Sequence, residues 1–230
     1  MSVLVRLSVS SAWDGLAKGI TAELLSGAEP IFLKAGDTLF EAGDNASGCF
    51  RLDKGVLKVS LASPQGAERI IALLKSGSIV GDLGLIDGLP RSARVTALTN
   101  SQLRFISRAS FRACAARHPE IHEFLVRVLV ARLRQTAETI SALAFLTAKG
   151  RVAFALLELA GALGEKTSSG GVKIPHAISQ KDLAALAGVA RENTNRILRN
   201  WQQRQIITKS AKKYVIEDIS NLEKEIDWEV

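Results

Sequence analysis

The segment from Ile178 to Trp201, ISQKDLAALAGVARENTNRILRNW, has the pattern of two short helices joined by a tight turn. Ser179 and Asp182 are spaced as in a helix N-terminus, where a hydroxyl accepts an unpaired amide and an acid reaches back. Gly188 supplies a sharp turn that a residue with a side chain would strain. We therefore predict a helix-turn-helix in this segment.

The second helix of this pair is expected to open near Ala190 with polar residues concentrated at its start. In this motif that end enters the major groove and contacts base edges. Arg191 and Arg196 would each bind guanine O6 and N7, and Glu192 would accept from cytosine N4. The candidate DNA-binding residues, including contacts to phosphate, are Ser179, Gln180, Arg191, Glu192, Asn193, Asn195, Arg196, Lys212 and Lys213.

Positive charge is concentrated around this motif. Residues 149–216 contain twelve Lys and Arg but four Asp and Glu, a net charge of +8, whereas the whole chain carries +7. Such a local excess is typical of a surface that binds nucleic-acid phosphates. The alternatives are a helical hairpin with a solvated charged face, or a nucleotide-binding module that never reads DNA and uses the charge for another acidic partner. The charge distribution favours double-stranded DNA as the partner.

Composition restricts the class of protein. A chain of 230 residues with 47% apolar content predicts one or two domains. No apolar run approaches the ~18 residues that cross a bilayer, and no secretion signal is recognisable. Two distant cysteines fit a reducing compartment, so we expect a cytoplasmic protein with no membrane partner. No nucleophile–base pair or phosphate-binding loop motif is found, and we predict that the protein is not an enzyme.

The same composition argues against metal cofactors. Residues 1–48 contain no cysteine, which excludes an N-terminal iron–sulfur cluster, and residues 1–117 contain no histidine for a haem. The remaining histidines have no apparent third ligand, so no metal site is predicted. A thiol switch at Cys49 or Cys114 stays open, although buried inert cysteines are more common.

After a short helical lead-in, the chain between Ile31 and about Ile106 alternates short β-type runs with glycine or Asx turns, which predicts an antiparallel barrel or jelly roll. The expected strands are Phe32–Leu33, Thr38–Phe40, Cys49–Leu52, Val56–Leu61, Glu68–Leu73, Ile79–Val80, Arg94–Leu98 and Gln102–Ile106.

A short helix, Ala109–Arg117, and a long one, about Glu120–Leu146, are expected to follow. The long helix carries a seam suited to pairing with an identical helix, although the same stripe could pack on the chain's own barrel. The seam positions are Leu129, Leu133, Thr136, Ile140 and Leu143.

The C-terminal part is predicted to contain a hinge, a helix, a loop and a wing. Gly150 marks the hinge, Arg151–Gly161 forms an amphipathic helix, and residues 164–171 form a flexible loop. Ile206–Thr208 and Lys213–Ile216 are expected to form a two-stranded wing. The acidic tail from Asp218 has no predicted role.

A barrel, a long seam helix and a winged helix-turn-helix in this order resemble the cyclic-AMP receptor/fumarate-nitrate regulator (Crp/Fnr) family of bacterial transcription regulators. VGDLGLIDGLPRSARVTAL resembles its phosphate-binding cassette, ALAFLTAKGRV the end of its dimer helix and its hinge, and ARENTNRIL its recognition helix. Gly43, Gly55 and Gly81 stand where the family has turn glycines. The resemblance implies an α+β homodimer with an N-terminal antiparallel β-roll (1–118), a dimerisation helix and hinge (119–147) and a winged helix-turn-helix domain (148–230).

In family terms, the cassette would bind a small anionic effector such as cyclic AMP. Arg91 can grip an anionic oxygen and Ser92 adds a hydroxyl donor, while Asp82 would accept the ribose hydroxyl. The residues implied for effector binding are Gly81, Asp82, Leu83, Arg91, Ser92, Ala93 and Thr136. From the residues alone, the favoured interpretation is that Arg91 pairs with Asp87 on a barrel surface and that the glycines serve turns only. The resemblance shifts the balance towards an anionic nucleotide.

Three features depart from the cyclic-AMP receptor pattern. Asp82 is one methylene shorter than the family's Glu, Ala137 replaces a hydroxyl residue, and the loop before Arg91 is one residue shorter. These departures leave three interpretations open: the effector is cyclic AMP, it is another ligand, or there is none. The resemblance further implies a palindromic DNA site with half-sites near TGTGA, and RNA polymerase as a partner.

Overall fold

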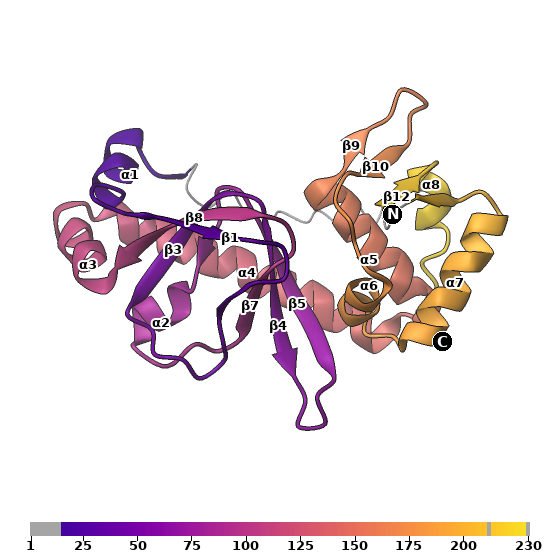
Figure 1. The fold of residues 1–230 in the computed structure, drawn as a ribbon, viewed down its shortest axis with the longest axis horizontal. Helices are drawn as coiled ribbons and strands as arrows, with labels where there is room; N and C mark the ends of the chain where they lie inside the picture. Colours follow the sequence, from indigo (N-terminus) through magenta and orange to yellow (C-terminus); the bar gives the residue numbers. More distant parts are fainter. Residues whose placement is uncertain (1–14, 211–212, 229–230) are drawn as a thin grey trace. The chain divides into compact units, whose positions relative to one another are not determined.

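The computed structural model describes residues 15–210 and 213–228, and the chain divides into two compact units. One unit is built mainly from the residues up to Arg134, and the other from Gln135 onward. The first is a β-roll with flanking helices and the second is a winged helix-turn-helix, so the predicted α+β fold is confirmed (Figure 1).

Two four-stranded antiparallel sheets form the β-roll, with strand orders β1-β8-β3-β6 and β2-β7-β4-β5. All eight predicted strands are present. Their bounds are β1 Pro30–Leu33, β2 Thr38–Phe40, β3 Gly48–Lys54, β4 Val56–Ala62, β5 Glu68–Lys75, β6 Ile79–Val80, β7 Arg94–Ala97 and β8 Ser101–Ser107.

An apolar core fills the β-roll, because alternate side chains of each strand point inward. Leu52, Leu57 and Leu103 have no exposed surface there. The turn between β3 and β4 depends on Gly55, whose φ of +100° is left-handed. A Cβ at this position would lie 2.3 Å from the Ser101 hydroxyl oxygen, so a side chain would not fit.

Four helices accompany the strands of this unit or lead out of it: α1 Lys18–Leu24, α2 Asp82–Asp87, α3 Arg108–Arg117 and α4 Glu120–Phe145. α1 and α3 pack against each other, where Leu24 and Phe111 join a second apolar core with Ile121 and Phe124 of α4. Of the described helices, none combines the length and apolar content that a bilayer crossing requires.

One face of α4 leaves apolar side chains uncovered. Leu133 is 71% exposed and Ile140 60%, and both belong to the predicted seam. The other predicted apolar members, Leu129 and Leu143, are half-buried, whereas Val126 and Val130 are exposed. The uncovered stripe therefore follows Val126, Val130, Leu133, Ala137 and Ile140, which has helical spacing and no interrupting threonine.

The second unit is organised around α5, whose side chains are buried along most of its length. Its elements are α5 Ala148–Leu163, β9 Glu165–Lys166, β10 Val172–Ile174, α6 Gln180–Ala187, α7 Arg191–Gln203, β11 Ile207–Ser210, β12 Lys213–Ile216 and α8 Ile219–Glu223. The four strands form one antiparallel sheet in the order β11-β12-β10-β9.

Two predictions from the sequence differ from the observed structure of this unit. The segment 164–171 is not wholly a loop, because Glu165–Lys166 pairs with β10 and widens the predicted two-stranded wing to four strands. Gly150 lies inside the first turn of α5 rather than before it, and its amide donates to the Thr147 hydroxyl at 3.1 Å. Glycine is required there for space, since a Cβ would lie 2.7 Å from the Asp227 carbonyl oxygen.

The core of this unit contains the acidic side chain of Glu158. Glu158 of α5 is 9% exposed, and burial together with repulsion from Glu138 raises the pKa of its carboxyl from 4.5 to about 7. The folded state therefore holds this proton more tightly than the unfolded chain does.

This pKa predicts how stability depends on pH. The contribution of Glu158 is fully present below pH 4.5 and is lost as pH rises from about 4.5 to 7, a change of about 3 kcal/mol. Glu158→Gln has no such carboxyl group and should not show this pH dependence. The unfolding free energy of the variant relative to wild type should therefore rise by about 3 kcal/mol between pH 4.5 and 8. Urea unfolding at one protein concentration measures it. A mutant-to-wild-type difference that stays constant with pH would contradict the assignment.

Candidate functional site

The predicted recognition motif consists of α6, a glycine turn and α7. The Ser179 hydroxyl oxygen accepts the Asp182 amide at 3.0 Å and donates to the Asp182 carboxylate, which fixes the start of α6. Gly188 has the left-handed φ of +59° that the turn requires. Helix start, turn and second helix all fall where the sequence predicted them.

The inner side of α7 is anchored in the core of its unit. Ile197, Leu198 and Trp201 are buried, as predicted. Thr194 has no exposed surface, and its hydroxyl donates to the Ala190 carbonyl at 3.1 Å. This packing fixes which face of the helix is turned outward.

The outer face of α7 presents most of the predicted base-contacting residues. Arg191, Glu192 and Arg196 are exposed. Arg196 Nη2 donates to Asn193 Oδ1 at 2.8 Å, which orders the guanidinium before any contact with DNA. Asn195 is placed differently: it is half-buried, and its Oδ1 is buried without a hydrogen-bond partner among the described residues.

The other predicted DNA contacts belong to α6 and to the wing. The hydroxyl of Ser179 already serves the α6 cap, Gln180 is the half-buried first residue of α6, and Lys213 is exposed at the start of β12. Lys212 lies outside the described residues. Sequence reasoning missed Arg199, which is exposed on α7 three residues after Arg196, a spacing that places both on one face.

In the β-roll, Arg91 is only 6% exposed and its guanidinium is held by the protein backbone. Nη1 donates to the Gly81 carbonyl at 2.7 Å and Nη2 to the Gly48 carbonyl at 2.8 Å, and the group lies 4.4 Å from the Phe40 ring centre. Arg91 does not pair with Asp87, whose Oδ1 accepts the Leu89 amide. The surface-pair interpretation is therefore wrong.

Gly81 has a φ of +76°, and a Cβ there would lie 2.2 Å from Arg91 Nη1. Glycine is thus needed both for the backbone conformation and for the guanidinium beside it.

Asp82 has no exposed surface and forms an ion pair that the sequence did not predict. Its Oδ1 accepts from Arg132 Nη1 at 2.6 Å, and Arg132 Nη2 donates to the Ile79 carbonyl at 3.0 Å. Asp82 Oδ2 is buried without a hydrogen-bond partner among the described residues. The sequence offered one indication of this pair: Arg132 is a cation on α4, a helix rich in apolar residues.

The remaining predicted effector residues differ in exposure. Leu83 and Ser92 are exposed beside the buried Ala93. Thr136 is exposed on α4 and belongs to the second unit.

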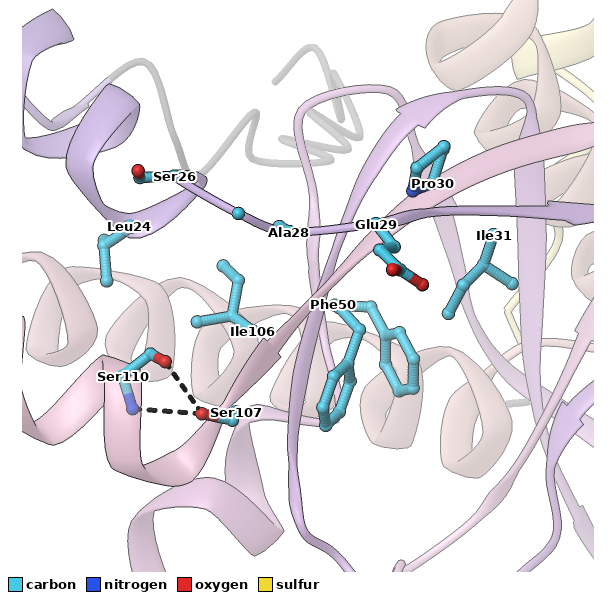
Figure 2. Close-up of a pocket in the computed structure, with 12 residues that line it drawn as sticks. Leu24, Ser26, Ala28, Glu29, Pro30, Ile31, Phe50, Ile106, Ser107 and Ser110 are labelled. Atoms are coloured by element: carbon cyan, nitrogen blue, oxygen red, sulfur yellow. Dashed lines mark hydrogen bonds between the residues drawn. The ribbon is translucent and has the colours of Figure 1, made fainter.

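A pocket of about 450 Å³ in the β-roll unit has no residue in common with the cassette (Figure 2). Its lining is mostly apolar and includes Phe50, Phe105 and Ile106, with Ser107 and Ser110 at one side. Ser107 and Ser110 are hydrogen-bonded to each other at the start of α3, so their hydroxyls already have partners.

Both cysteines are buried in ways that suppress reactivity. Burial raises the pKa of the Cys49 thiol to about 12 and also raises that of Cys114. Protonated buried thiols are poor nucleophiles, which disfavours a thiol switch.

Cys114 lies near Glu23 and His118, a set of side chains that could ligate a metal. However, Arg117 donates to the same Glu23 carboxylate, and His118 Nε2 lies 2.9 Å from its Oε2. The Arg117 and His118 hydrogen bonds lower the Glu23 pKa to about 2. Because the Arg117 guanidinium already binds the Glu23 carboxylate, this cluster is better explained as a polar link between α1 and α3 than as a metal site.

Comparison with known proteins agrees with this architecture. Residues 30–118 match the cyclic nucleotide-binding domain, and residues 150–225 match the Crp-like helix-turn-helix domain. The chain is 32% identical over 183 residues to the cAMP-activated global transcriptional regulator CRP of Haemophilus influenzae, covering 79% of this chain and 81% of that protein. The chain belongs to the Crp/Fnr family. It is thus a DNA-binding transcription regulator with a cyclic nucleotide-binding domain, and not an enzyme.

A further relative and two solved structures extend the likeness. A CRP-like cAMP-activated global transcriptional regulator of Mycobacterium tuberculosis is 29% identical over 216 residues, 94% of this chain and 96% of that protein. Two solved structures share the fold. The c-di-GMP-responsive regulator CLP of Xanthomonas campestris has a TM-score of 0.78 at 22% identity, covering 88% of this chain and 100% of that one. FixK2 of Bradyrhizobium japonicum has a TM-score of 0.76 at 19% identity, covering 88% of this chain and 98% of that one.

The Asp82–Arg132 pair can be tested by stability measurements. Arg132→Met should lower the unfolding free energy by about 3 kcal/mol, because it leaves a fully buried carboxylate without its cation. Asp82→Asn combined with Arg132→Met should cost less than Arg132→Met alone. Denaturant unfolding provides the measurement.

Arg127→Met is the matched control on the same helix. Arg127 pairs with Glu123 in solvent at 3.8 Å, so its loss should change the unfolding free energy by less than about 1 kcal/mol. Equal effects of the two single variants would contradict a special role for the buried pair.

Proposed function

We propose that this regulator binds palindromic duplex DNA as a homodimer, and that a small anionic effector bound in the β-roll controls the binding. Cyclic AMP is the first candidate for that effector. The observation that carries the proposal is the uncovered apolar stripe on α4 in a chain that also exposes a cationic recognition helix.

Dimerisation through α4 follows from the cost of leaving this stripe in water. Each large aliphatic side chain gains roughly 1.5–3 kcal/mol on full burial, and two α4 helices packed together would cover the stripes of both chains. Leu133 and Ile140 are its most exposed large side chains. In this proposal the roles divide along the chain as effector sensing (1–118), dimerisation (119–147) and DNA binding (148–230).

DNA recognition is assigned to the outer face of α7. Arg191 and Arg196 donate to guanine O6 and N7, and Glu192 accepts from cytosine N4, in half-sites near TGTGA one helical turn apart. Asn193 contributes by orienting Arg196, with which it is already hydrogen-bonded. Asn195 has a weaker claim because its Oδ1 is turned inward.

Phosphate contacts set the register of the protein on the duplex without reading sequence. The candidates are Ser179 and Gln180 at the start of α6, Lys212 and Lys213 in the wing, and Arg199 on α7. RNA polymerase and a cytoplasmic location complete the proposal, as the family resemblance implies.

The chemistry of the cassette fits an anionic nucleotide. Arg91 supplies a fixed positive charge, and the free Oδ2 of Asp82 is a buried acceptor for a ribose hydroxyl. Ser92 adds an exposed donor, Leu83 and Ala93 flank these groups, and Thr136 would act from α4. Relatives in Haemophilus influenzae and Mycobacterium tuberculosis are cAMP-activated regulators, which further supports this candidate.

A regulator with a different effector, or with none, is the second candidate. It is favoured by the state of Arg91, whose guanidinium already bonds to two backbone carbonyls and stacks on Phe40. In that case the arginine serves to hold the strands together.

The DNA-binding proposal predicts a large preference for a palindromic TGTGA-type duplex over a scrambled duplex at one salt concentration. Arg191→Ala should weaken binding to the palindrome by about 1–3 kcal/mol and relax discrimination at one base pair. Fluorescence anisotropy measures the affinities, and sedimentation of the complex should give two chains per duplex.

An equal loss on both duplexes would show that Arg191 contacts phosphate only. A single chain bound per palindrome would contradict the homodimer.

The effector proposal predicts that cyclic AMP binds to the purified protein in calorimetry and that Arg91→Ala weakens it at least about tenfold, because the charge-assisted bonds are lost. Cyclic GMP and c-di-GMP are titrated in parallel to separate the nucleotide classes. Unchanged affinity in Arg91→Ala would rule out the cassette, and heat from none of the nucleotides would favour the second candidate.

A further inference from the structure

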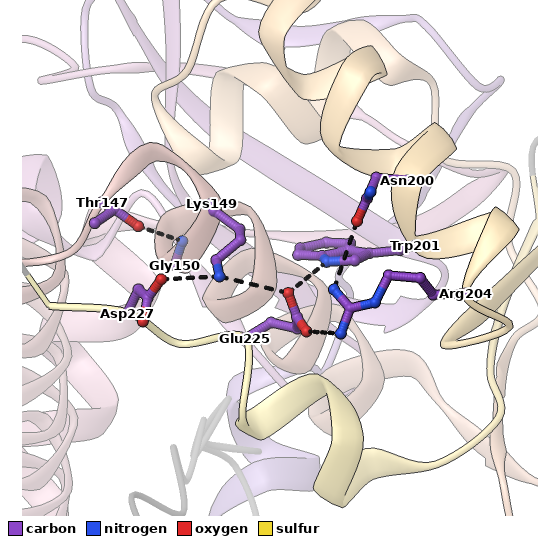
Figure 3. A network of polar contacts seen from close by, with 8 residues as sticks. All are labelled: Thr147, Lys149, Gly150, Asn200, Trp201, Arg204, Glu225 and Asp227. Carbon is purple, nitrogen blue, oxygen red and sulfur yellow. Dashed lines mark hydrogen bonds and ion pairs between the residues drawn. The ribbon is translucent and has the colours of Figure 1, made fainter.

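The acidic C-terminal tail, for which the sequence predicted no role, contacts two separate segments of the DNA-binding unit. It begins with α8, whose Leu222 has no exposed surface, and continues to Trp228. Its contacts go to the C-terminal end of α7 and to the segment 146–150 that joins α4 to α5 (Figure 3).

Glu225 is the centre of these contacts and is only 5% exposed. Its Oε2 accepts from Trp201 Nε1 at 2.9 Å, and its Oε1 accepts from Arg204 Nη2 at 2.6 Å (Figure 3). Lys149 Nζ lies 3.6 Å from Oε2 on the other side. One buried carboxylate therefore joins α7 to the first turn of α5.

Asp227 completes the attachment at the junction of α4 and α5. Its carboxylate pairs with Lys149 at 2.8 Å, and its carbonyl oxygen accepts the Thr147 amide at 3.0 Å. The next residue, Trp228, forms a β-bridge with Leu146. The tail backbone lies so close to Gly150 that no side chain would fit there.

Burial alone would raise the pKa of Glu225, but the Arg204 and Trp201 hydrogen bonds and the charges of Arg204 and Lys149 lower it overall. The carboxylate is therefore ionised at neutral pH, and both cations remain bound to it.

Because these contacts lie at the C-terminal end of α7, a small change of helix angle there produces a large displacement of the N-terminal end. Trp201 and Arg204 lie at the C-terminal end of the helix, and Arg191 lies ten residues before Trp201, about 15 Å away at ~1.5 Å per residue. Tilting the helix by ~10° about its clasped end would move Arg191 by about 3 Å. A shift of that size breaks bidentate hydrogen bonds to a base.

We propose that the tail segment Ile219–Trp228 is a clasp, and that Glu225 is a positioning residue that fixes the recognition helix relative to the α4–α5 junction. A change at the junction would then be transmitted to α7 through Glu225, so the clasp would couple the junction to the recognition helix. This inference rests on the proposed recognition of palindromic DNA by α7.

The test compares Glu225→Gln with Glu223→Gln in the full chain. Both variants remove one negative charge from the same tail, so their general attraction to DNA changes equally, but Glu223 lies outside the network. Glu225→Gln should bind the palindromic duplex about tenfold more weakly than Glu223→Gln, a coupling of ordinary size, while both bind scrambled DNA equally. Equal palindrome-to-scrambled ratios in the two variants would overturn the positioning role.

A second arm keeps the inference testable if Glu225→Gln folds poorly. Lys149→Gln removes the junction side of the network and should also reduce the palindrome-to-scrambled ratio. The double variant should lose less than the product of the two single effects, because both act through one contact. Multiplicative effects would show that junction and helix are independent.

Trp201→Phe retains most of the aromatic packing but loses the indole donor to Glu225, and it should reduce the same ratio. Thermal unfolding of every variant separates loss of folding from loss of positioning. If the wild-type protein binds palindrome and scrambled duplex equally, the proposed DNA recognition itself is wrong and this inference is wrong with it. A preference that is present in wild type and unchanged in Glu225→Gln is evidence against the clasp alone.

Discussion

The apolar stripe that the described residues leave exposed on α4 is the constraint on which the proposed assembly depends. Leu133 and Ile140 are largely exposed on α4, and water around such side chains is unfavourable. In the proposed homodimer, a matching helix from a second chain would cover them and would place two recognition helices in a symmetric pair. The palindromic form of the proposed DNA site follows from that symmetry, since each half-site meets the same surface.

Buried charge is treated in two ways in the two units. Asp82 and Glu225 are both withdrawn from water, and each forms ion pairs with arginine or lysine side chains. For Glu158, burial and the nearby Glu138 raise the pKa, and no cation offsets them, so the protonated form is favoured. The paired carboxylates link elements that are distant in the sequence, whereas Glu158 makes the stability of the DNA-binding unit sensitive to acidity.

Local patterns were sufficient to predict most of the fold. The eight strands of the β-roll, the long helix and the helix-turn-helix follow from alternation, helical spacing, glycine turns and one capping serine, all of which act over a few residues. The contacts that the sequence did not reveal join distant segments. The partner of Asp82 is Arg132, fifty residues away, and Glu225 meets Trp201 across twenty-four. The β9–β10 pair was missed because Glu165–Lys166 is too short and polar for a strand pattern and is held by its neighbour.

The self-bonded state of Arg91 has a consequence for how the regulator would respond to an effector. A ligand that enters the cassette competes with the Gly81 and Gly48 carbonyls and with the Phe40 ring for the same guanidinium. Part of the intrinsic affinity is then spent on releasing the arginine, so the observed affinity is lower than the contacts alone would give. In a regulator controlled by such a ligand, this internal competition would raise the ligand concentration needed for a response above the background levels of related anions.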